Sequence, residues 1–233
     1  MRFRPSLWLT VSGAVAFAIL CGLGYWQLER RAWKNGLIEQ VEARMDNAAV
    51  PLPDRIGDPD AWRFRRVSVS GVFHHDGEVY RTGKAEGGVI GYRVFTPLER
   101  PDGSMILVER GWVPERFKDP AARPDEPPAG PVSFTGVLRL PDETGLFTPA
   151  PDAASLTWFA VDPAAMAASS GRQVPDWYVA AEQGHGAWPR AERPDLRMRN
   201  EHLNYALTWF SLAAVLLVIW VIIGFRRGQE SAR

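Results

Sequence analysis

The sequence has little cysteine and no excess of charge of either sign. Its only cysteine is Cys21, which lies inside an apolar run, so no disulfide can form within the chain. The long part between this run and the next has no cysteine, which fits an oxidising compartment. Lysine plus arginine and aspartate plus glutamate number 27 each, whereas nucleic-acid-binding proteins usually show a basic excess. These absences exclude a disulfide-stapled domain and argue against a nucleic-acid partner.

Catalytic and metal-binding motifs are also missing. The sequence has no Gly-x-Ser-x-Gly turn, phosphate-cradling glycine loop, Cys-x-x-Cys pair or His-Glu-x-x-His helix. His74 and His75 are adjacent, and adjacent side chains of a strand point to opposite faces, so we interpret both as surface histidines. His185 lies among glycines in a predicted loop and has no visible partner. We therefore expect a protein that is not an enzyme and that has no zinc or copper site.

Two long apolar runs stand near the ends of the chain. Leu7–Trp26 has no charged residue, and Leu203–Phe225 is rich in leucine, valine and isoleucine; each is long enough to cross a bilayer as a helix. A cleavable signal peptide is the alternative for the first run. However, its apolar core is longer than usual, and it ends in an aromatic residue typical of a membrane interface. We therefore predict transmembrane helices over residues 7–28 and 200–225.

Basic residues predict the orientation of these helices. Positive residues near short tails favour the cytoplasmic side, so we predict cytoplasmic tails over residues 1–6 and 226–233. Residues 29–199 then form a periplasmic domain, and the protein is a multi-pass protein of a bacterial inner membrane. The flanking residues are Arg2, Arg4, Arg226 and Arg227.

Small residues predict that the two spans pack against each other. Ala14, Ala18 and Gly22 form a row at a spacing of four, which allows a second helix to approach closely. Ala206 and Ala213 are expected to face this row from the second span.

The middle of the chain changes from helical to alternating spacing. Residues 29–45 keep apolar side chains at helical spacing, so the first helix is expected to continue out of the membrane. Beyond Pro53 the pattern has period two, which predicts strands separated by turns such as Asp102-Gly103. The fold class is therefore α+β, with two transmembrane helices flanking an antiparallel β-sheet domain that is barrel- or sandwich-like and has a short helix after Asp162. The predicted strands are residues 66–73, 89–96, 105–113, 132–140, 156–161 and 177–180.

The outer exits of the two spans hold the candidate site residues. An ionisable side chain at the mouth of a span is costly, so His202 is a site candidate by default. In an antiparallel pair both exits lie at the same depth, and helical spacing brings His202 near the aromatic and polar residues of both. An imidazole, aromatic walls and an arginine for a propionate suit a haem; an aromatic belt with anchoring basic groups is the alternative. The other residues are Trp26, Gln27, Arg30, Tyr205 and Trp209.

Several blocks of the sequence resemble signature blocks of the surfeit-locus-one family, which are assembly factors of haem-copper cytochrome oxidase. The resemblance covers nearly the whole chain, including its two-span plan. Glu109 and Pro151 depart from it, because asparagine is usual at both places. The matching blocks are Gly24–Gln27 with Arg30 and Trp33, Gly91-Tyr92 with Thr96–Leu98, Leu107–Pro114, and Asn200–Phe210.

The resemblance implies an assembly factor that binds haem a at the outer membrane interface and assists its insertion into subunit I of cytochrome c oxidase. Within the family, the histidine matching His202 is the candidate axial ligand of the haem iron. Subunit I, haem a synthase and membrane lipid are the implied partners. Two alternatives stay open: a structural assembly factor that stabilises an oxidase subunit without haem, and a membrane enzyme acting on haem. The enzyme ranks last, because only one histidine lies near a span.

Overall fold

The computed structural model describes residues 5–84, 88–191 and 201–230. It divides into two compact units, residues 1–40 with 197–233 and residues 41–196. We call the first the helical pair and the second the β-domain, and each is described by itself. The predicted site range begins at Asn200, which lies outside the described residues, as do Arg2 and Arg4 of the predicted tail.

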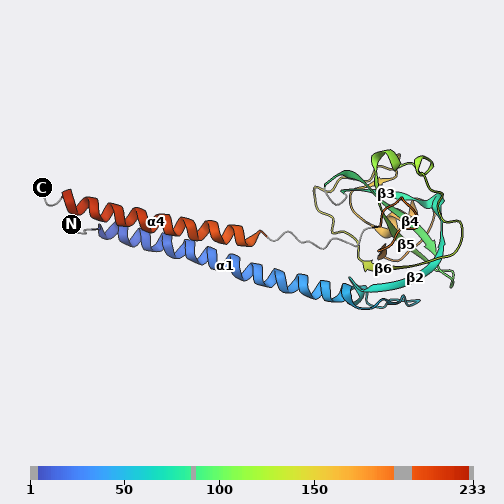
Figure 1. Ribbon diagram of the computed structural model, residues 1–233, viewed down its shortest axis with the longest axis horizontal. Helices are drawn as coiled ribbons and strands as arrows, with labels where there is room; N and C mark the ends of the chain where they lie inside the picture. Colours follow the sequence, from blue (N-terminus) through green and yellow to red (C-terminus); the bar gives the residue numbers. More distant parts are fainter. Residues whose placement is uncertain (1–4, 85–87, 192–200, 231–233) are drawn as a thin grey trace. The chain divides into compact units, whose positions relative to one another are not determined.

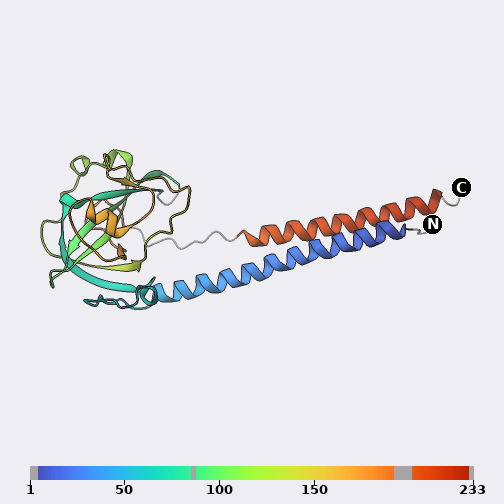
Figure 2. The same cartoon turned by 180° about the vertical axis from the view of Figure 1, so that it is seen from behind.

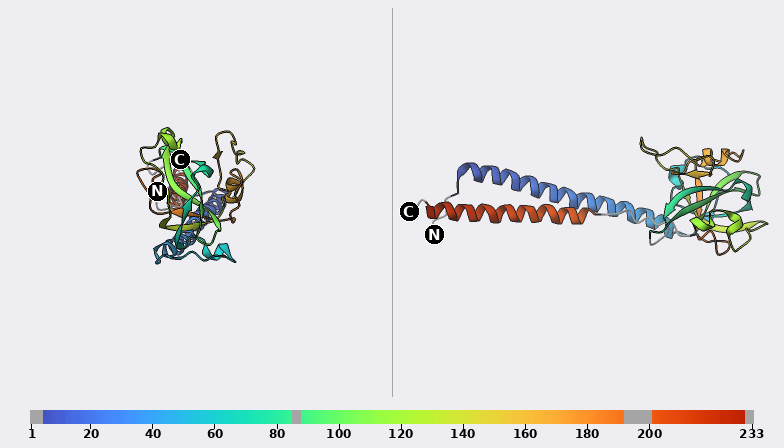
Figure 3. Two further views of the ribbon diagram at one scale, coloured as in Figure 1. Left: turned by 90° about the vertical axis from the view of Figure 1, so that its right-hand side faces the viewer. Right: turned by 90° about the horizontal axis from the view of Figure 1, so that it is seen from above.

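The helical pair consists of α1 (Leu7–Asp46) and α4 (His202–Glu230). Figures 1 and 2 show the two helices side by side, with both chain termini at the same end. Both helices are long and apolar enough to cross a membrane. Helix α1 is continuous over 40 residues, as its helical spacing on both sides of Trp26 predicts. Figure 3 shows α1 continuing past the point where α4 begins.

The packing seam of the helical pair follows a spacing of three and four residues. Ala206 and Ala213, with exposed fractions of 1% and 3%, are buried as predicted. The predicted row Ala14, Ala18 and Gly22 is wrong, because these residues are exposed. A row at constant spacing of four drifts around a helix, whereas alternating spacings of three and four stay aligned with a partner. The seam residues are Gly13, Phe17, Leu20, Gly24 and Gln27 on α1 and His202, Ala206, Trp209, Ala213, Leu216, Trp220 and Gly224 on α4.

The β-domain contains one eight-stranded sheet that closes on itself. Strands β2, β6, β8, β5 and β4 pair in that order, and β4 pairs again with β2 through Val72–Glu99 and Phe73–Leu98. This ring confirms the predicted barrel. The strands are β1 (Val50–Pro51), β2 (Arg66–Phe73), β3 (Val79–Lys84), β4 (Ile90–Glu99), β5 (Met105–Pro114), β6 (Val132–Arg139), β7 (Thr157–Trp158) and β8 (Tyr178–Ala181).

The sheet is mixed, which corrects the prediction of an antiparallel sheet. Strand β8 runs parallel to β5 and antiparallel to β6, and the short strands β1 and β7 run parallel to β2 and β3. A parallel pair needs a long connection, and the chain from β5 to β8 supplies one that includes β6 and α3 (Pro163–Ala168). The predicted hairpin at Asp102-Gly103 is confirmed, since it joins β4 to β5 and Gly103 has a φ of 80°.

Apolar side chains fill both faces of the barrel wall. The interior cluster includes Val67, Phe73, Leu98 and Val108. Helix α3, capped by Asp162 as predicted, contributes Met166 to a second cluster with Phe95, Leu107 and Tyr178 on the outer face. The last turns of α1 add Val41 and Met45 against Val137. Short helical segments complete the domain: α2 (Pro59–Trp62) and single turns at His75–Gly77, Glu115–Phe117 and Pro120–Ala122.

Candidate functional site

The sequence-predicted site lies where α4 begins. His202 is the first residue of α4, and its Nδ1 lies 2.7 Å from Oε1 of Gln27 on α1. An amide oxygen accepts hydrogen bonds, so with the side chain in this orientation Nδ1 carries the proton and donates it. Nε2 then has a lone pair, because neutral imidazole has one donor and one acceptor nitrogen. The contact therefore fixes the tautomer and the orientation of a half-buried histidine.

Gly24 sets the separation of the two helices one turn away from this contact. A Cβ at position 24 would lie 2.7 Å from two ring carbons of Phe210, so a larger residue would require this ring to shift. At Gly22 a Cβ would meet nothing within 4 Å. The glycine of the Gly24–Gln27 block thus has a packing role, which brings Gln27 within reach of His202.

Three of the other predicted site residues, Trp26, Arg30 and Tyr205, lie on the surface of the helical pair. Trp26 and Tyr205 have exposed fractions of 53% and 57%. The guanidinium carbon of Arg30 lies 4.2 Å from the ring centroid of Trp33, on the same helix, which is a cation–π contact. Trp209 is half-buried in the seam. The structure therefore brings together His202 and Gln27, and it leaves two aromatic rings and one cation open to solvent or lipid.

Helical geometry relates these exposed groups to His202. Trp26, Arg30 and Trp33 are spaced by four and three residues and so share one face of α1, beside that of Gln27. Tyr205 lies on the corresponding side of His202 along α4. Because the two right-handed helices run antiparallel, these two displaced faces lie on the same flank of the pair. We call this flank the aromatic flank.

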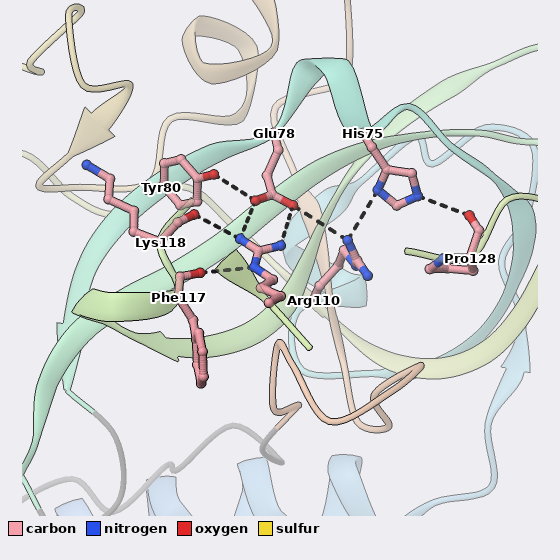
Figure 4. A network of polar contacts seen from close by, with 8 residues as sticks. His75, Glu78, Tyr80, Arg110, Phe117, Lys118 and Pro128 are labelled. Carbon is pink, nitrogen blue, oxygen red and sulfur yellow. Dashed lines mark hydrogen bonds and ion pairs between the residues drawn. The ribbon is translucent and has the colours of Figure 1, made fainter. Parts of the chain in front are cut away.

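A second polar cluster, which the sequence reasoning missed, lies in the β-domain around Glu78 (Figure 4). Glu78 is 5% exposed, and its carboxylate accepts hydrogen bonds from Nη1 and Nη2 of Arg123 at 3.1 and 2.6 Å. The hydroxyl of Tyr80 donates to the same carboxylate at 2.8 Å, and Nη1 of Arg110 lies 3.5 Å from it. Arg123 also donates to the carbonyl oxygens of Phe117 and Lys118. We call these residues the Glu78 network.

His75 extends the Glu78 network, which corrects its assignment as a surface histidine. Its Nε2 lies 3.0 Å from the carbonyl oxygen of Pro128, and its Nδ1 lies 3.3 Å from Nη1 of Arg110. The carbonyl accepts and the guanidinium donates, so both ring nitrogens are used by a neutral imidazole. Burial lowers the pKa of His75 below its ordinary value, and the positive charge of Arg110 acts in the same direction.

His185 is also placed differently from the sequence prediction. Its ring packs edge-on against Phe73 and Phe134, at centroid distances of 6.0 and 5.7 Å. Burial lowers its pKa, and Arg110 contributes in the same direction. His185 is therefore a packed histidine at one end of the barrel interior, and not a loop residue without partners.

Strand geometry explains how Arg110 enters the network. Ile106 and Val108 point into the barrel, and Arg110 follows them at the same period of two. The pairing of β4 with β5 shifts register at this point, since Val94 faces Gly111 and Phe95 faces Glu109, so Arg110 is the extra residue of a bulge. The strand that carries Arg110 was predicted from the sequence, as residues 105–113. The partners of Arg110 come from distant segments and were not predicted.

The described residues contain no group of three or more histidine, cysteine, aspartate or glutamate side chains that could hold a metal ion. The Glu78 carboxylate is held by hydrogen bonds and ion pairs to Tyr80, Arg110 and Arg123, which cross-link segments of the barrel. By contrast, His202 has a coordinating nitrogen and an open flank beside it. The arrangement at His202 suits an axial ligand to a prosthetic group better than a metal-ion site.

Comparison with known proteins agrees with the architecture. The model of the SURF1 family matches residues 14–214. A SURF1-like protein of Monosiga brevicollis is 33% identical, over 90% of this chain and 85% of that protein. Surfeit locus protein 1 of Homo sapiens is 33% identical and that of Xenopus tropicalis 32%, each over 85% of this chain and 72% and 70% of those proteins. The chain therefore belongs to the SURF1 family, a family of cytochrome c oxidase assembly factors.

Proposed function

We propose that this protein binds haem a at the exit of the helical pair and assists its insertion into subunit I of cytochrome c oxidase. The observation that carries the proposal is the 2.7 Å contact between Nδ1 of His202 and Oε1 of Gln27. Histidines that ligate metals almost always donate their other ring N–H to an acceptor, which fixes the tautomer and raises ligand basicity. Gln27 supplies that acceptor and leaves Nε2 of His202 for the iron.

The aromatic flank fits the rest of a haem. A porphyrin needs an apolar face to lie on and a cation near its propionates. Trp26 and Tyr205 present exposed aromatic rings on the aromatic flank, beside His202. Arg30 is exposed and already stacked on Trp33, so its planar fork is held near the membrane interface, where it matches a carboxylate.

Delivery of the cofactor requires no covalent step by this chain. Haem a supplies its redox chemistry only in the recipient oxidase. The residues of this chain bind it, orient it and shield part of one face. A single protein ligand on an open flank favours release, whereas a closed pocket with two ligands would favour retention. This fits the role of an assembly factor that does not act as an enzyme.

The proposal includes the location of the site. The two apolar helices indicate membrane association. We propose a bacterial inner membrane with both tails cytoplasmic and residues 29–199 periplasmic, so that His202 lies near the periplasmic interface. Subunit I is the proposed recipient and haem a synthase the proposed donor, with membrane lipid around the helical pair.

The test is the absorbance spectrum of the full-length protein, purified in detergent from cells that make haem a. We expect haem a in the wild type and loss of most of it in His202→Ala. His74→Ala is the matched control, because it removes a histidine of the β-domain that contacts Glu99 and leaves the helical pair unchanged. His202→Ala with an unchanged haem content and spectrum would show that the ligand lies elsewhere.

A structural assembly role without haem is the second candidate function. It predicts that wild-type protein from the same cells carries no haem a and still binds subunit I. The β-domain, with its cross-linked barrel, would then be the working surface.

A further inference from the structure

The loop between β6 and β7 is the longest connection between the named elements of the described β-domain that has no regular structure. It covers the residues between Arg139 and Thr157. Loops longer than about 12 to 15 residues without secondary structure are uncommon in compact domains and usually functional. In the right-hand view of Figure 3 this loop stands away from the barrel.

Both ends of the loop are fixed to the domain. At one end, the backbone N–H of Asp142 donates to the carbonyl oxygen of Val161 at 2.9 Å. The carboxylate of Asp142 accepts from the N–H of Val161 at 3.0 Å and pairs with Arg81 at 3.2 Å. At the other end, Asp152 and Thr157 exchange two backbone hydrogen bonds of 2.8 and 3.0 Å. The segment between the two aspartates is therefore an arm with two anchored ends.

The middle of the arm is a defined turn that presents two apolar side chains. The N–H of Thr148 donates to the carbonyl oxygen of Gly145 at 3.0 Å, and the hydroxyl of Thr148 accepts from the N–H of Gly145 at 2.9 Å. Between them, Leu146 is 100% exposed and Phe147 is 97% exposed. We call Leu146 and Phe147 the apolar tip. An ordered turn that holds a leucine and a phenylalanine wholly in solvent marks an interaction site.

The charge of the arm decides between a protein and a lipid partner. Residues 140–156 include Asp142, Glu143 and Asp152 and no lysine or arginine. Asp142 is paired with Arg81, so Glu143 and Asp152 give the arm its net negative charge. Surfaces that bind anionic membranes carry basic residues next to their apolar groups, so an acidic arm is repelled by such a membrane. The same charge complements an apolar pocket with a basic rim on a protein.

We propose that the apolar tip docks into an apolar, basic-rimmed pocket of the oxidase subunit that this protein assists. The identity of that partner rests on the proposed function, whereas the apolar tip and its acidic arm are features of the β-domain alone. Phe147 is the anchor, because aromatic side chains that fill a pocket dominate the binding energy of protein interfaces. Docking through the β-domain and haem binding through the helical pair are then separable functions of one chain.

The test measures binding of full-length protein in detergent to detergent-solubilised subunit I. The double variant Leu146→Ser with Phe147→Ser is expected to weaken binding at least tenfold, without loss of thermal stability or of bound haem a. The matched control is Val89→Ser with Ile90→Ser, which removes apolar side chains with exposed fractions of 57% and 72% elsewhere on the β-domain. The control is expected to bind like the wild type.

Three outcomes would overturn the inference. Equal binding by the tip variant and the wild type is one, and equal weakening by the control variant is another. The third is lipid contact: in nanodiscs of phosphatidylethanolamine and phosphatidylglycerol, a fluorophore on Phe147→Cys in a Cys21→Ser background would be quenched by spin-labelled lipid. Failure of the proposed function would be recognised by a different result, because the wild type would then carry no haem a. His202→Ala should lose haem a and keep its affinity for subunit I.

Discussion

The helical pair and the β-domain each hold a histidine in a fixed tautomer, and the two differ in what remains available. At His75 both ring nitrogens are used, one by the carbonyl of Pro128 and one by Arg110. At His202 the contact with Gln27 uses Nδ1 alone. The first arrangement cross-links a barrel and has no capacity for a ligand. The second fixes a side chain and keeps a coordinating nitrogen, which is what a site for a transferable prosthetic group requires.

The same difference holds for the arginines of the two units. Arg110 and Arg123 are buried against Glu78, and each forms an internal ion pair with its carboxylate. Arg30 is exposed and held only by the ring of Trp33. A buried charge that loses its partner is destabilising, whereas an exposed one is not. The β-domain is therefore expected to respond to substitution by unfolding, and the helical pair by losing the haem a that we propose it binds.

The largest expected effect is on the stability of the β-domain. Glu78→Ala leaves two arginines and a tyrosine hydroxyl without their acceptor, and we expect a loss of about 3–5 kcal/mol in unfolding free energy. The measurement is thermal unfolding of the full chain in detergent, followed by circular dichroism. Glu99→Ala is the matched control, because its carboxylate is half-exposed and pairs with His74 at the surface of the β-domain. A loss below about 1 kcal/mol would show that the network is not a structural cross-link.

A smaller effect, on ligand binding, is expected in the helical pair. Gly24→Ala places a methyl group against the ring of Phe210, and such overpacking typically costs about 1–3 kcal/mol. The helices should separate near Gln27, so we expect weaker retention of haem a during detergent washing. Gly22→Ala is the matched control, since a methyl group there meets no atom within 4 Å.

Phe210→Ala tests the cause of the Gly24→Ala effect. If the clash with the Phe210 ring causes the weaker retention in Gly24→Ala, the double variant Gly24→Ala with Phe210→Ala should retain haem a again. Equal retention by Gly24→Ala and Gly22→Ala would mean that the close approach at Gly24 does not position the site.

The sequence was sufficient for features that depend on local pattern. Apolar length predicted both spans, period two predicted β2 and β6, and Asp162 with Pro163 predicted α3. Strand β3 was not among the predicted strands. The seam of the helical pair was not predicted, because the choice between Ala14–Ala18–Gly22 and Gly13–Phe17–Leu20–Gly24 depends on the supercoil of two helices. The contact of Gln27 with His202 was within the prediction, because antiparallel packing places both exits at one depth.

Features that depend on distant partners were beyond the sequence. The parallel pairing of β5 with β8 depends on where the chain returns to the sheet after α3. The sequence of a short strand does not indicate which strands will pair with it. Glu78 accepts from Arg123, 45 residues further along the chain. Arg110 lay within a predicted strand, but its partners did not follow from the sequence. The roles of all six candidate residues in binding a cofactor stay predictions: His202, Trp26, Gln27, Arg30, Tyr205 and Trp209.

The smallest expected effect is a pH dependence of stability that arises from His75. Burial holds the pKa of His75 below its ordinary value of 6.5, so the unfolded chain takes up the proton first as the pH falls. Stability should therefore be full above about pH 6.5 and should decline through the window just below it, by on the order of 1 kcal/mol or less because partial exposure screens the effect.

His75→Gln tests this assignment, because an amide can donate to Pro128 and accept from Arg110 without titrating. The variant should unfold at nearly the same temperature at neutral pH and show a flatter decline between about pH 7 and pH 5. His185 has a pKa lowered by burial as well, so His185→Gln should remove a further part of the slope. An unchanged slope in both variants would mean that neither histidine is held neutral by the barrel. In that case His75 and His202 would differ only in hydrogen-bond geometry: His75 has two partners and His202 has Gln27. The difference would have no effect on the free energy of unfolding.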